Sequence, residues 1–340
     1  MNIAVLGSGS WATAIVKIAT QNHNTVHWWV RENEIVEGVR QYGRNPLFLR
    51  SCQLDTSKIE ITTDIKKVIS STDTVVLVIP SAFVEKSLQG LTPEDFENKT
   101  IISATKGIIP STNQIVADYL QTQFKVELEQ QAVLSGPSHA EEIAQDGMTY
   151  LTIGAHSQSL AQQLANRFAC RFVKTRTSTD IRGIEYSAVL KNIYALTAGI
   201  CKGAGYGDNF ISVLISNAAQ EMQRFLDVVA KNEIRDTNNF VYLGDLLVTA
   251  YSQHSRNRTF GQMIGQGYTV KSAQLEMSMV AEGYYATDCI HKTNAKLKLS
   301  LSFAENTYNN VPATWQLKDA CKGVSVDGNV ITVLPDASMG

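Results

Sequence analysis

The chain has 340 residues, of which 44% are hydrophobic and 18% are charged. This length is long for one hydrophobic core and favours two domains in a protein of ordinary soluble, globular composition. Its 30 basic and 32 acidic side chains leave a formal net charge of −2. Such a balance argues against a nucleic-acid binder that works through a basic surface.

The cysteines are scattered and form no C-x-x-C pair. This pattern indicates reduced thiols in the cytoplasm and neither a disulfide framework nor a metal site. The N-terminus has neither the basic segment nor the long apolar stretch of a signal peptide. Apolar runs such as Val75–Ile79 have the length of a strand, so we expect no membrane span.

The first apolar segment, Ile3–Leu6, leads directly into Gly7-Ser-Gly-Ser-Trp-Ala-Thr-Ala14, with the spacing G-x-G-x-x-A. In a strand–turn–helix unit, Gly7 permits the tight turn, Gly9 admits a pyrophosphate, and Ala12 lets the helix pack closely. The positive end of the helix would face that pyrophosphate. The alternative is a glycine turn that merely joins two elements. We favour a dinucleotide site.

Strand and helix patterns alternate over the first half of the chain. Strands are expected at residues 3–6, 25–30, 58–62, 73–79, 100–104, 132–135, 150–155 and 171–175. Helices are expected at residues 11–19, 32–42, 64–70, 114–123 and 138–144, after Pro80, and near Leu164. The alternation predicts an α/β, doubly wound (Rossmann-type), mostly parallel sheet. Ligands of such sheets bind at the carboxyl ends of the strands, where Arg31, Pro80, Lys106 and Gly136 fall.

Helical patterns dominate from about Thr179 onward, at residues 181–199, 211–232, 243–253 and 288–299. We therefore expect a dinucleotide-binding domain over residues 1–178 and an all-helical, substrate-binding domain over residues 179–340. The tail near Asp327-Gly328 is typical of a small hairpin.

Arg31 ends the second expected strand, where NAD-preferring folds carry an acidic residue for the ribose 2′-hydroxyl. Its guanidinium group suits the 2′-phosphate of NADP, although Glu32 beside it is an acidic residue of the kind that favours NAD. We expect NADP or NAD as the cofactor, with NADP favoured.

Lys191 lies in the middle of an expected helix, on a stripe of small apolar residues. A lysine in this position usually snorkels from the end of a buried face. The alternative is a lysine that meets substrate, with Asn192 beside it as a neutral hydrogen-bond partner. The helix alone leaves both interpretations open.

Two further groups of polar residues lie in the helical half. Asp245 and Thr249 are one turn apart and share a helix face. Ser255-Arg256-Asn257 combines a hydroxyl, a guanidinium and an amide, which can hold a phosphate or can form a polar helix cap. In the first half, Lys106 is either a solvated loop lysine or a ligand-binding group at the end of a strand.

Seven short motifs occur together and in order: Gly7-Ser-Gly-Ser-Trp-Ala-Thr-Ala14, Ala104-Thr-Lys-Gly107, Ser135-Gly-Pro-Ser138, Leu190-Lys-Asn192, Leu243-Gly-Asp-Leu246, Ser255-Arg-Asn-Arg258 and Ala281-Glu-Gly-Tyr284. With them, the chain resembles the bacterial NAD(P)-dependent glycerol-3-phosphate dehydrogenases from residue 3 to about residue 290. The resemblance implies reduction of dihydroxyacetone phosphate to sn-glycerol 3-phosphate, which feeds phospholipid synthesis. The resemblance is also compatible with a homodimer.

The resemblance implies roles for individual residues. Lys191 would donate and accept the proton, with Lys106 and Asp245 as the other catalytic residues. The substrate contacts would be Lys106, Gly136, Ser138, Lys191, Asn192, Asp245, Thr249, Ser255, Arg256 and Asn257, among which Arg256 and Asn257 form the phosphate clamp. The cofactor contacts would be Gly7, Gly9, Ser10, Trp11, Arg31, Lys106, Ala140, Arg256, Val280 and Glu282.

The chain departs from the family pattern at three places. Ala12 stands where the family usually has glycine, and Ser187 and Ala188 replace paired glycines before Lys191. The region after Lys298 matches poorly.

Two other interpretations are a hydroxyacid or 6-phosphogluconate-like dehydrogenase, and a dinucleotide-binding redox sensor without turnover. The Ser255-Arg256-Asn257 motif disfavours the first, and the intact Lys191-Asn192 pair disfavours the second.

Overall fold

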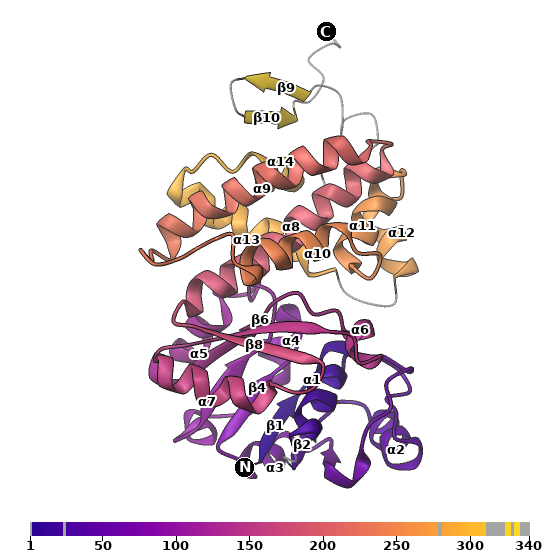
Figure 1. Ribbon diagram of the computed structural model, residues 1–340, viewed down its shortest axis with the longest axis vertical. Coiled ribbons are helices and arrows are strands. Elements are labelled where there is room, and N and C mark those ends of the chain that lie inside the picture. Colours follow the sequence, from indigo (N-terminus) through magenta and orange to yellow (C-terminus); the bar gives the residue numbers. More distant parts are fainter. Residues whose placement is uncertain (1, 23–24, 278–280, 311–323, 328–329, 334–340) are drawn as a thin grey trace. The chain divides into compact units, whose positions relative to one another are not determined.

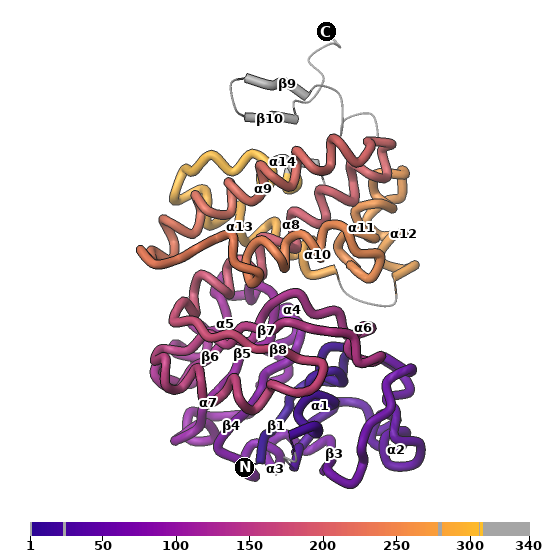
Figure 2. The backbone as a smooth tube through the Cα atoms, viewed as in Figure 1, coloured from indigo at the N-terminus to yellow at the C-terminus, as the bar shows by residue number. Residues whose placement is uncertain are grey.

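The computed structural model describes residues 2–22, 25–277, 281–310, 324–327 and 330–333. Contacts along the backbone divide the chain into two units, Met1–Glu185 and Tyr186–Gly340 (Figure 1, Figure 2). The division falls within helix α8 (Ile181–Gly203), whereas the predicted boundary after Ser178 precedes this helix.

The N-terminal unit contains an eight-stranded sheet with the order β3-β2-β1-β4-β5-β6-β7-β8. The strands are β1 (Ile3–Leu6), β2 (Val26–Trp29), β3 (Ile59–Thr62), β4 (Thr74–Leu77), β5 (Thr100–Ser103), β6 (Gln131–Ser135), β7 (Thr149–Ala155) and β8 (Val173–Ser178). Neighbouring strands are parallel except β6 and β7, which are antiparallel. The predicted doubly wound, mostly parallel sheet is confirmed.

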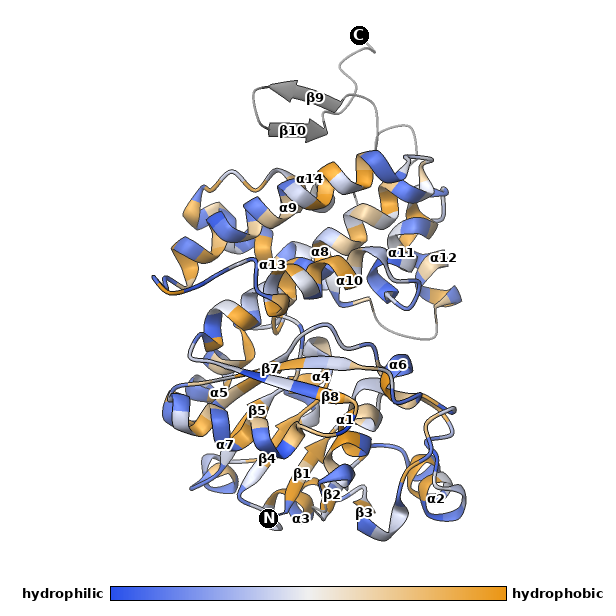
Figure 3. Cartoon of the chain, in the orientation of Figure 1, coloured by the Kyte–Doolittle hydropathy of each residue, from blue (hydrophilic) through white to orange (hydrophobic). Residues whose placement is uncertain are grey.

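Helices connect these strands and cover the sheet: α1 (Ser10–Gln21), α2 (Asn33–Tyr42), α3 (Ile65–Ser70), α4 (Ser81–Ser87), α5 (Val116–Phe124), α6 (Ala140–Ala144) and α7 (Gln158–Phe168). Strand β1 is buried on both sides, since Ile3 and Val5 belong to one apolar cluster and Ala4 and Leu6 to another. Figure 3 shows the apolar central strands. A continuous apolar run is the pattern expected of a parallel strand between two layers of helices.

Strand β1 lies between β2 and β4, so the chain reverses its direction of winding there. Ligands of doubly wound folds bind beside such a switch point, at the carboxyl ends of the strands. Strands β1, β2, β4, β5 and β6 run the same way, so the segments that follow them share one edge of the sheet. That edge carries Gly7, Arg31, Pro80, Lys106 and Gly136.

The C-terminal unit is built mainly from helices: α8, α9 (Asp208–Val229), α10 (Asp245–Tyr251), α11 (Arg256–Gly265), α12 (Val270–Glu276), α13 (Glu282–Leu297) and α14 (Ser302–Asn310). A π-helical turn, Phe240–Gly244, precedes α10. Strands β9 (Val324–Asp327) and β10 (Val330–Val333) pair antiparallel, as expected for the predicted hairpin, and its Gly328 lies outside the described residues. Among the described residues, no helix is long and apolar enough to cross a membrane.

Several predicted boundaries are wrong. Helix α13 begins at Glu282, well before the expected Asp288, and α5 begins at Val116. Strand β8 extends to Ser178 because an edge strand tolerates polar residues that hide its periodicity. Helices α11, α12 and α14 were not predicted, because polar side chains fill much of their length and obscure the apolar face.

Glu185 gives the fold a pH-dependent stability. Its buried Oε2 accepts a hydrogen bond from the Ala117 N–H at 3.0 Å. Burial raises the pKa of its carboxyl group from 4.5 to about 7, against the lowering effect of the Ala117 bond. The folded state thus holds this proton more tightly than the unfolded chain. Its contribution to stability is therefore full below about pH 4.5 and is lost as the pH rises to about 7.

Glu185→Gln keeps an acceptor for the Ala117 N–H and removes the charge. We expect the variant to be more stable than the wild type at pH 8, by roughly 2–3 kcal/mol, and nearly equal to it near pH 5. Thermal melts of both proteins between pH 5 and 8 measure this difference. Parallel melting profiles would show that Glu185 does not titrate in this range.

Candidate active site

The glycine-rich turn has the geometry of an anion cradle. Gly7 has φ +151°, and a Cβ atom there would lie 2.2 Å from the Val78 carbonyl oxygen, so only glycine fits. A Cβ atom at Gly9 would meet nothing within 4 Å, which leaves open space in front of α1. Gly9 is the N-cap of α1, whose first N–H groups and positive dipole end favour a phosphate. These residues fit the pyrophosphate of a dinucleotide.

Arg31 follows β2 beside this turn, and its backbone N–H donates to Ser8 Oγ at 2.9 Å. Its side chain is 71% exposed, and its guanidinium is paired with Glu32, with Nε 2.9 Å from Oε1. Glu32 thus already pairs with the cation that the sequence predicts for a cofactor phosphate.

Lys106 lies after β5 and is held by its neighbours. Its Nζ is 5.0 Å from the centre of the Trp11 ring and 3.5 Å from Ser138 Oγ. The Trp11 indole N–H donates to the Ala104 carbonyl, and Ser138 Oγ donates to the Gly136 carbonyl. The structure therefore brings together four residues predicted from three separate motifs, Trp11, Lys106, Gly136 and Ser138. Ala140, a predicted cofactor contact, begins α6.

Lys191 and Asp245 form a buried ion pair in the C-terminal unit. Lys191 is 3% exposed and Asp245 1% exposed, and Lys191 Nζ contacts Asp245 Oδ2. A snorkelling lysine would reach solvent, so that interpretation is wrong. The π-helical turn before α10 places Asp245 on the first turn of that helix. Inserted turns of this kind are frequent at functional sites.

Thr249 and Asp245 do share one helix face, as predicted, but Thr249 Oγ1 donates to the Asp245 carbonyl at 2.5 Å. Ser255 caps α11, since its hydroxyl accepts from the Arg258 N–H at 3.3 Å. The cap interpretation is thus correct for Ser255. It also places Arg256, which is half-buried, on the first turn of a ten-residue helix, where a phosphate would be favoured.

Gly283, at the start of α13, contacts both α11 and α8. The Gly283 N–H donates to Asn257 Oδ1 at 2.8 Å. A Cβ atom at Gly283 would lie 2.4 Å from the Asn192 carbonyl oxygen, so the helices touch at this point. The contact joins three predicted site segments, at Asn192, Asn257 and Glu282. The predicted cofactor contact Val280 lies outside the described residues.

Helices α8 and α11 also pack backbone against backbone. A Cβ atom at Gly199 would lie 2.1 Å from the Arg258 carbonyl oxygen, and one at Gly261 would lie 2.1 Å from that of Leu196. This close approach sets the register of the helix that carries Lys191 against the helix that begins at Arg256.

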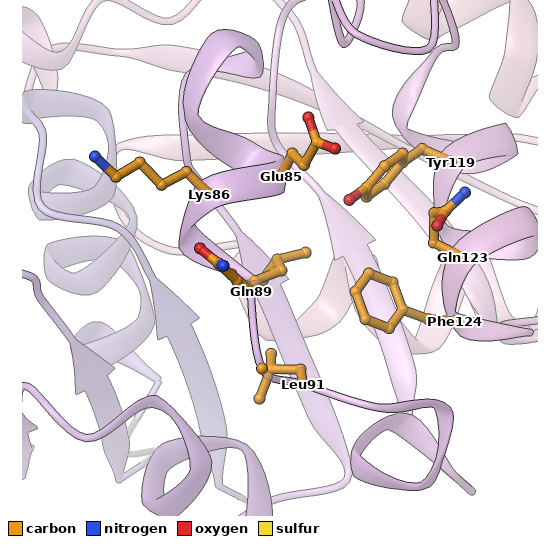
Figure 4. A pocket seen from close by; sticks show the side chains of 9 residues that line it. Glu85, Lys86, Gln89, Leu91, Tyr119, Gln123 and Phe124 are labelled. Carbon is orange, nitrogen blue, oxygen red and sulfur yellow. The ribbon is translucent and has the colours of Figure 1, made fainter.

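A pocket of about 520 Å³ lies elsewhere in the N-terminal unit, between the ends of α4 and α5. Figure 4 shows Tyr119, Gln123 and Phe124 on one side and Glu85 on the other. The pocket contains none of the predicted site residues. Within the described ranges, no group of three His, Cys, Asp or Glu residues could hold a metal ion.

Comparison with known proteins decides the family. Residues 2–161 match the family described as NAD-dependent glycerol-3-phosphate dehydrogenase N-terminus, and residues 180–322 match its C-terminal counterpart. The chain belongs to the NAD-dependent glycerol-3-phosphate dehydrogenase family. It is therefore an oxidoreductase that uses NAD or NADP. The family reduces dihydroxyacetone phosphate to sn-glycerol 3-phosphate.

Individual members of this dehydrogenase family are similar over most of their length. The glycerol-3-phosphate dehydrogenase (NAD(P)+) of Syntrophomonas wolfei is 32% identical over 321 residues, 93% of this chain and 92% of that protein. The Bacillus subtilis relative of the same name is 31% identical over 304 residues, 89% and 88% of the two chains. The crystal structure of the Coxiella burnetii enzyme superposes with a TM-score of 0.84 at 26% identity and covers 91% of this chain and 93% of its own.

Two residues that contact the predicted site were absent from the sequence prediction. Gly283 stood inside the Ala281-Glu-Gly-Tyr284 motif without a role, although a glycine on a helix is itself a signal of close approach. Asn45 stood in an expected loop, and nothing in the sequence around it marked the buried hydrogen bonds that its side chain makes.

Proposed function

We propose that the chain reduces dihydroxyacetone phosphate to sn-glycerol 3-phosphate with Lys191 as proton donor. The observation that carries this proposal is the buried ion pair between Lys191 and Asp245. When bound, NADPH or NADH supplies the hydride. The substrate oxygen then gains negative charge, and Lys191 Nζ neutralises it by giving up a proton.

Asp245 supports this role by position and charge. Its carboxylate holds Lys191 Nζ in place and favours the charged, proton-bearing form of the lysine. The Thr249 bond to the Asp245 backbone carbonyl and the first turn of α10 hold the backbone that carries this carboxylate. Lys106, Asn192, Gly136 and Ser138 are proposed to contact the substrate near its reacting end.

The substrate phosphate is assigned to the first turn of α11. There Arg256 supplies a guanidinium fork, and the helix end adds N–H groups and partial positive charge. Ser255 and Asn257 shape this turn through the Arg258 and Gly283 hydrogen bonds.

The cofactor is assigned to Gly7, Gly9, Ser10, Trp11, Arg31, Lys106 and Ala140 in the N-terminal unit, and to Arg256, Val280 and Glu282. The open space at Gly9 and the packed Gly7 support this assignment. We further propose a cytoplasmic enzyme, consistent with the free cysteines of the described chain, that supplies phospholipid synthesis and assembles as a homodimer.

The decisive assay is the oxidation of NADPH or NADH with dihydroxyacetone phosphate, followed at the nicotinamide absorbance band. Turnover that depends on dihydroxyacetone phosphate supports the proposed function. Binding of the dinucleotide without any turnover would instead support the redox sensor.

Arg31 gives a prediction about cofactor choice. NADPH is expected to be used at least as well as NADH, because the guanidinium can leave Glu32 for a 2′-phosphate. Arg31→Asp should shift the ratio of kcat/KM values toward NADH by about tenfold or more, and Glu32→Gln, which frees the guanidinium, should shift it toward NADPH. Steady-state rates with both cofactors measure the ratios. An unchanged ratio in Arg31→Asp would show that Arg31 does not discriminate between the cofactors.

A further inference from the structure

The side chain of Asn45 is fully buried beneath the glycine-rich turn. Its Nδ2 donates to the Ser8 carbonyl at 2.9 Å and to Thr13 Oγ1 at 2.9 Å. Its Oδ1 accepts from the N–H groups of Leu47 and Phe48 at 3.1 Å and 3.0 Å. All four hydrogen-bonding positions of the amide are therefore occupied.

Only one orientation of this amide satisfies its partners. A backbone carbonyl can only accept and a backbone N–H can only donate, so a reversed amide would lose the bonds to Ser8, Leu47 and Phe48 together. Asn45 thus connects the turn between β1 and α1 to the segment that follows α2, and it does so with a fixed direction of donation.

Thr13 extends the same network by one residue. Its Oγ1 accepts from Asn45 and donates to the Gly9 carbonyl at 3.1 Å, while the Thr13 N–H donates to the same carbonyl at 3.0 Å. The indole N–H of Trp28 donates to the Gly7 carbonyl at 2.7 Å. Three consecutive carbonyls, of Gly7, Ser8 and Gly9, thus each accept a hydrogen bond from a side chain.

Peptide geometry turns these bonds into a direction for the N–H groups. In a trans peptide the C=O and the following N–H point to opposite sides, and no cis peptide bond occurs among the described residues. A Ser8 carbonyl that faces Asn45 therefore turns the Gly9 N–H away from it. A Gly9 carbonyl that faces Thr13 likewise turns the Ser10 N–H outward. Successive N–H groups that point to one side form a site for an anion.

We propose that Asn45 is a positioning residue for the cofactor. Its amide holds the Ser8–Gly9 peptide, and through Thr13 the Gly9–Ser10 peptide, with the N–H groups toward the pyrophosphate. This inference rests on the proposed role of the glycine-rich turn in holding the dinucleotide. Without the amide, the Ser8–Gly9 peptide can rotate, and the pyrophosphate loses a preorganised donor.

Asn45→Ala and Asn45→Asp test the role. The alanine removes the amide, and the carboxylate of the second variant keeps the shape but has no hydrogen to donate. The dissociation constant of NADPH, measured by its fluorescence, should rise by about ten- to a hundredfold in both variants. The KM for NADPH should rise with it. The kcat at saturating NADPH and the KM for dihydroxyacetone phosphate should stay within about threefold of wild type, because neither depends on this peptide once the cofactor is bound.

Asn294→Ala is the matched control. Asn294 is also a buried amide that bridges a loop, since its Nδ2 donates to the Leu299 carbonyl and to Glu305 while its Oδ1 accepts from the Leu299 N–H. It should lower the melting temperature without changing NADPH affinity. Adenosine 2′-phosphate, which lacks a pyrophosphate, should inhibit the wild type and both Asn45 variants with similar inhibition constants.

Two outcomes would overturn the inference: NADPH affinity in folded Asn45→Ala within twofold of wild type, or an equal loss for NADPH and adenosine 2′-phosphate. The second result would mean that the whole domain had loosened. Wild-type protein that binds neither NADPH nor NADH would refute the proposed cofactor site itself, which is a different result from normal wild-type binding that Asn45→Ala leaves unchanged.

Discussion

Lys191→Met is expected to lower kcat for dihydroxyacetone phosphate by about 10²–10⁴-fold, which is the usual contribution of a positioned general acid. Methionine has a similar length and fills the buried space, but it carries no proton and no charge. Any stabilisation of the developing alkoxide by the lysine charge would enlarge the loss. The rate is measured by NADPH oxidation at saturating substrate, and NADPH binding, followed by fluorescence, should stay nearly intact.

The same substitution should destabilise the protein, because it leaves Asp245 charged, buried and without Lys191. Removal of one partner from a buried ion pair costs roughly 3–5 kcal/mol. The double variant Lys191→Met with Asp245→Asn removes both charges and should recover most of this stability. It should recover none of the activity. A purely structural ion pair would behave differently, because in that case the double variant would be active once folded.

Lys191→Arg provides the conservative control. Arginine keeps a positive charge near Asp245 but holds its proton too firmly to act as an acid at neutral pH, and its planar group has a different shape. We expect a stable protein with little activity. A kcat within tenfold of wild type in folded Lys191→Met would exclude Lys191 as the proton donor.

The sheet could be predicted from the sequence because each buried strand is an unbroken apolar run between turn residues. Ile3–Leu6 shows why, since its alternate side chains enter the two apolar clusters on opposite faces and no polar face interrupts the pattern. The carboxyl-end positions of Arg31, Lys106 and Gly136 followed from the parallel topology alone.

Contacts between distant helices could not be predicted in this way. A helical period shows which residues share a face but not what covers that face, so the pattern around Lys191 favoured snorkelling and also allowed contact with a substrate. Its partner Asp245 lies on another helix, and their ion pair depends on how the two helices pack. The polar start of α11 similarly hid a helix whose packing depends on Gly199 and Gly261.

Arg256→Ala is expected to raise the KM for dihydroxyacetone phosphate strongly. A guanidinium forms charge-assisted, often bidentate hydrogen bonds to a phosphate, and truncation of one partner of such a pair costs roughly 2–5 kcal/mol. That range corresponds to a loss of kcat/KM of about thirtyfold to several thousandfold. Arg256→Lys should restore part of the loss, since it keeps the charge without the fork. Steady-state kinetics with varied substrate measure both variants.

Two controls separate phosphate binding from general damage to the helix. Unphosphorylated dihydroxyacetone has no phosphate to lose, so its low kcat/KM should fall far less in Arg256→Ala. Arg258→Ala changes the same type of side chain on the same helix and keeps the backbone N–H that Ser255 caps. It should leave the KM for dihydroxyacetone phosphate within a few fold. An equal loss of kcat/KM for the two substrates in Arg256→Ala would show that Arg256 does not bind the phosphate. The backbone N–H groups of the first turn of α11 would then be the remaining donors to the phosphate.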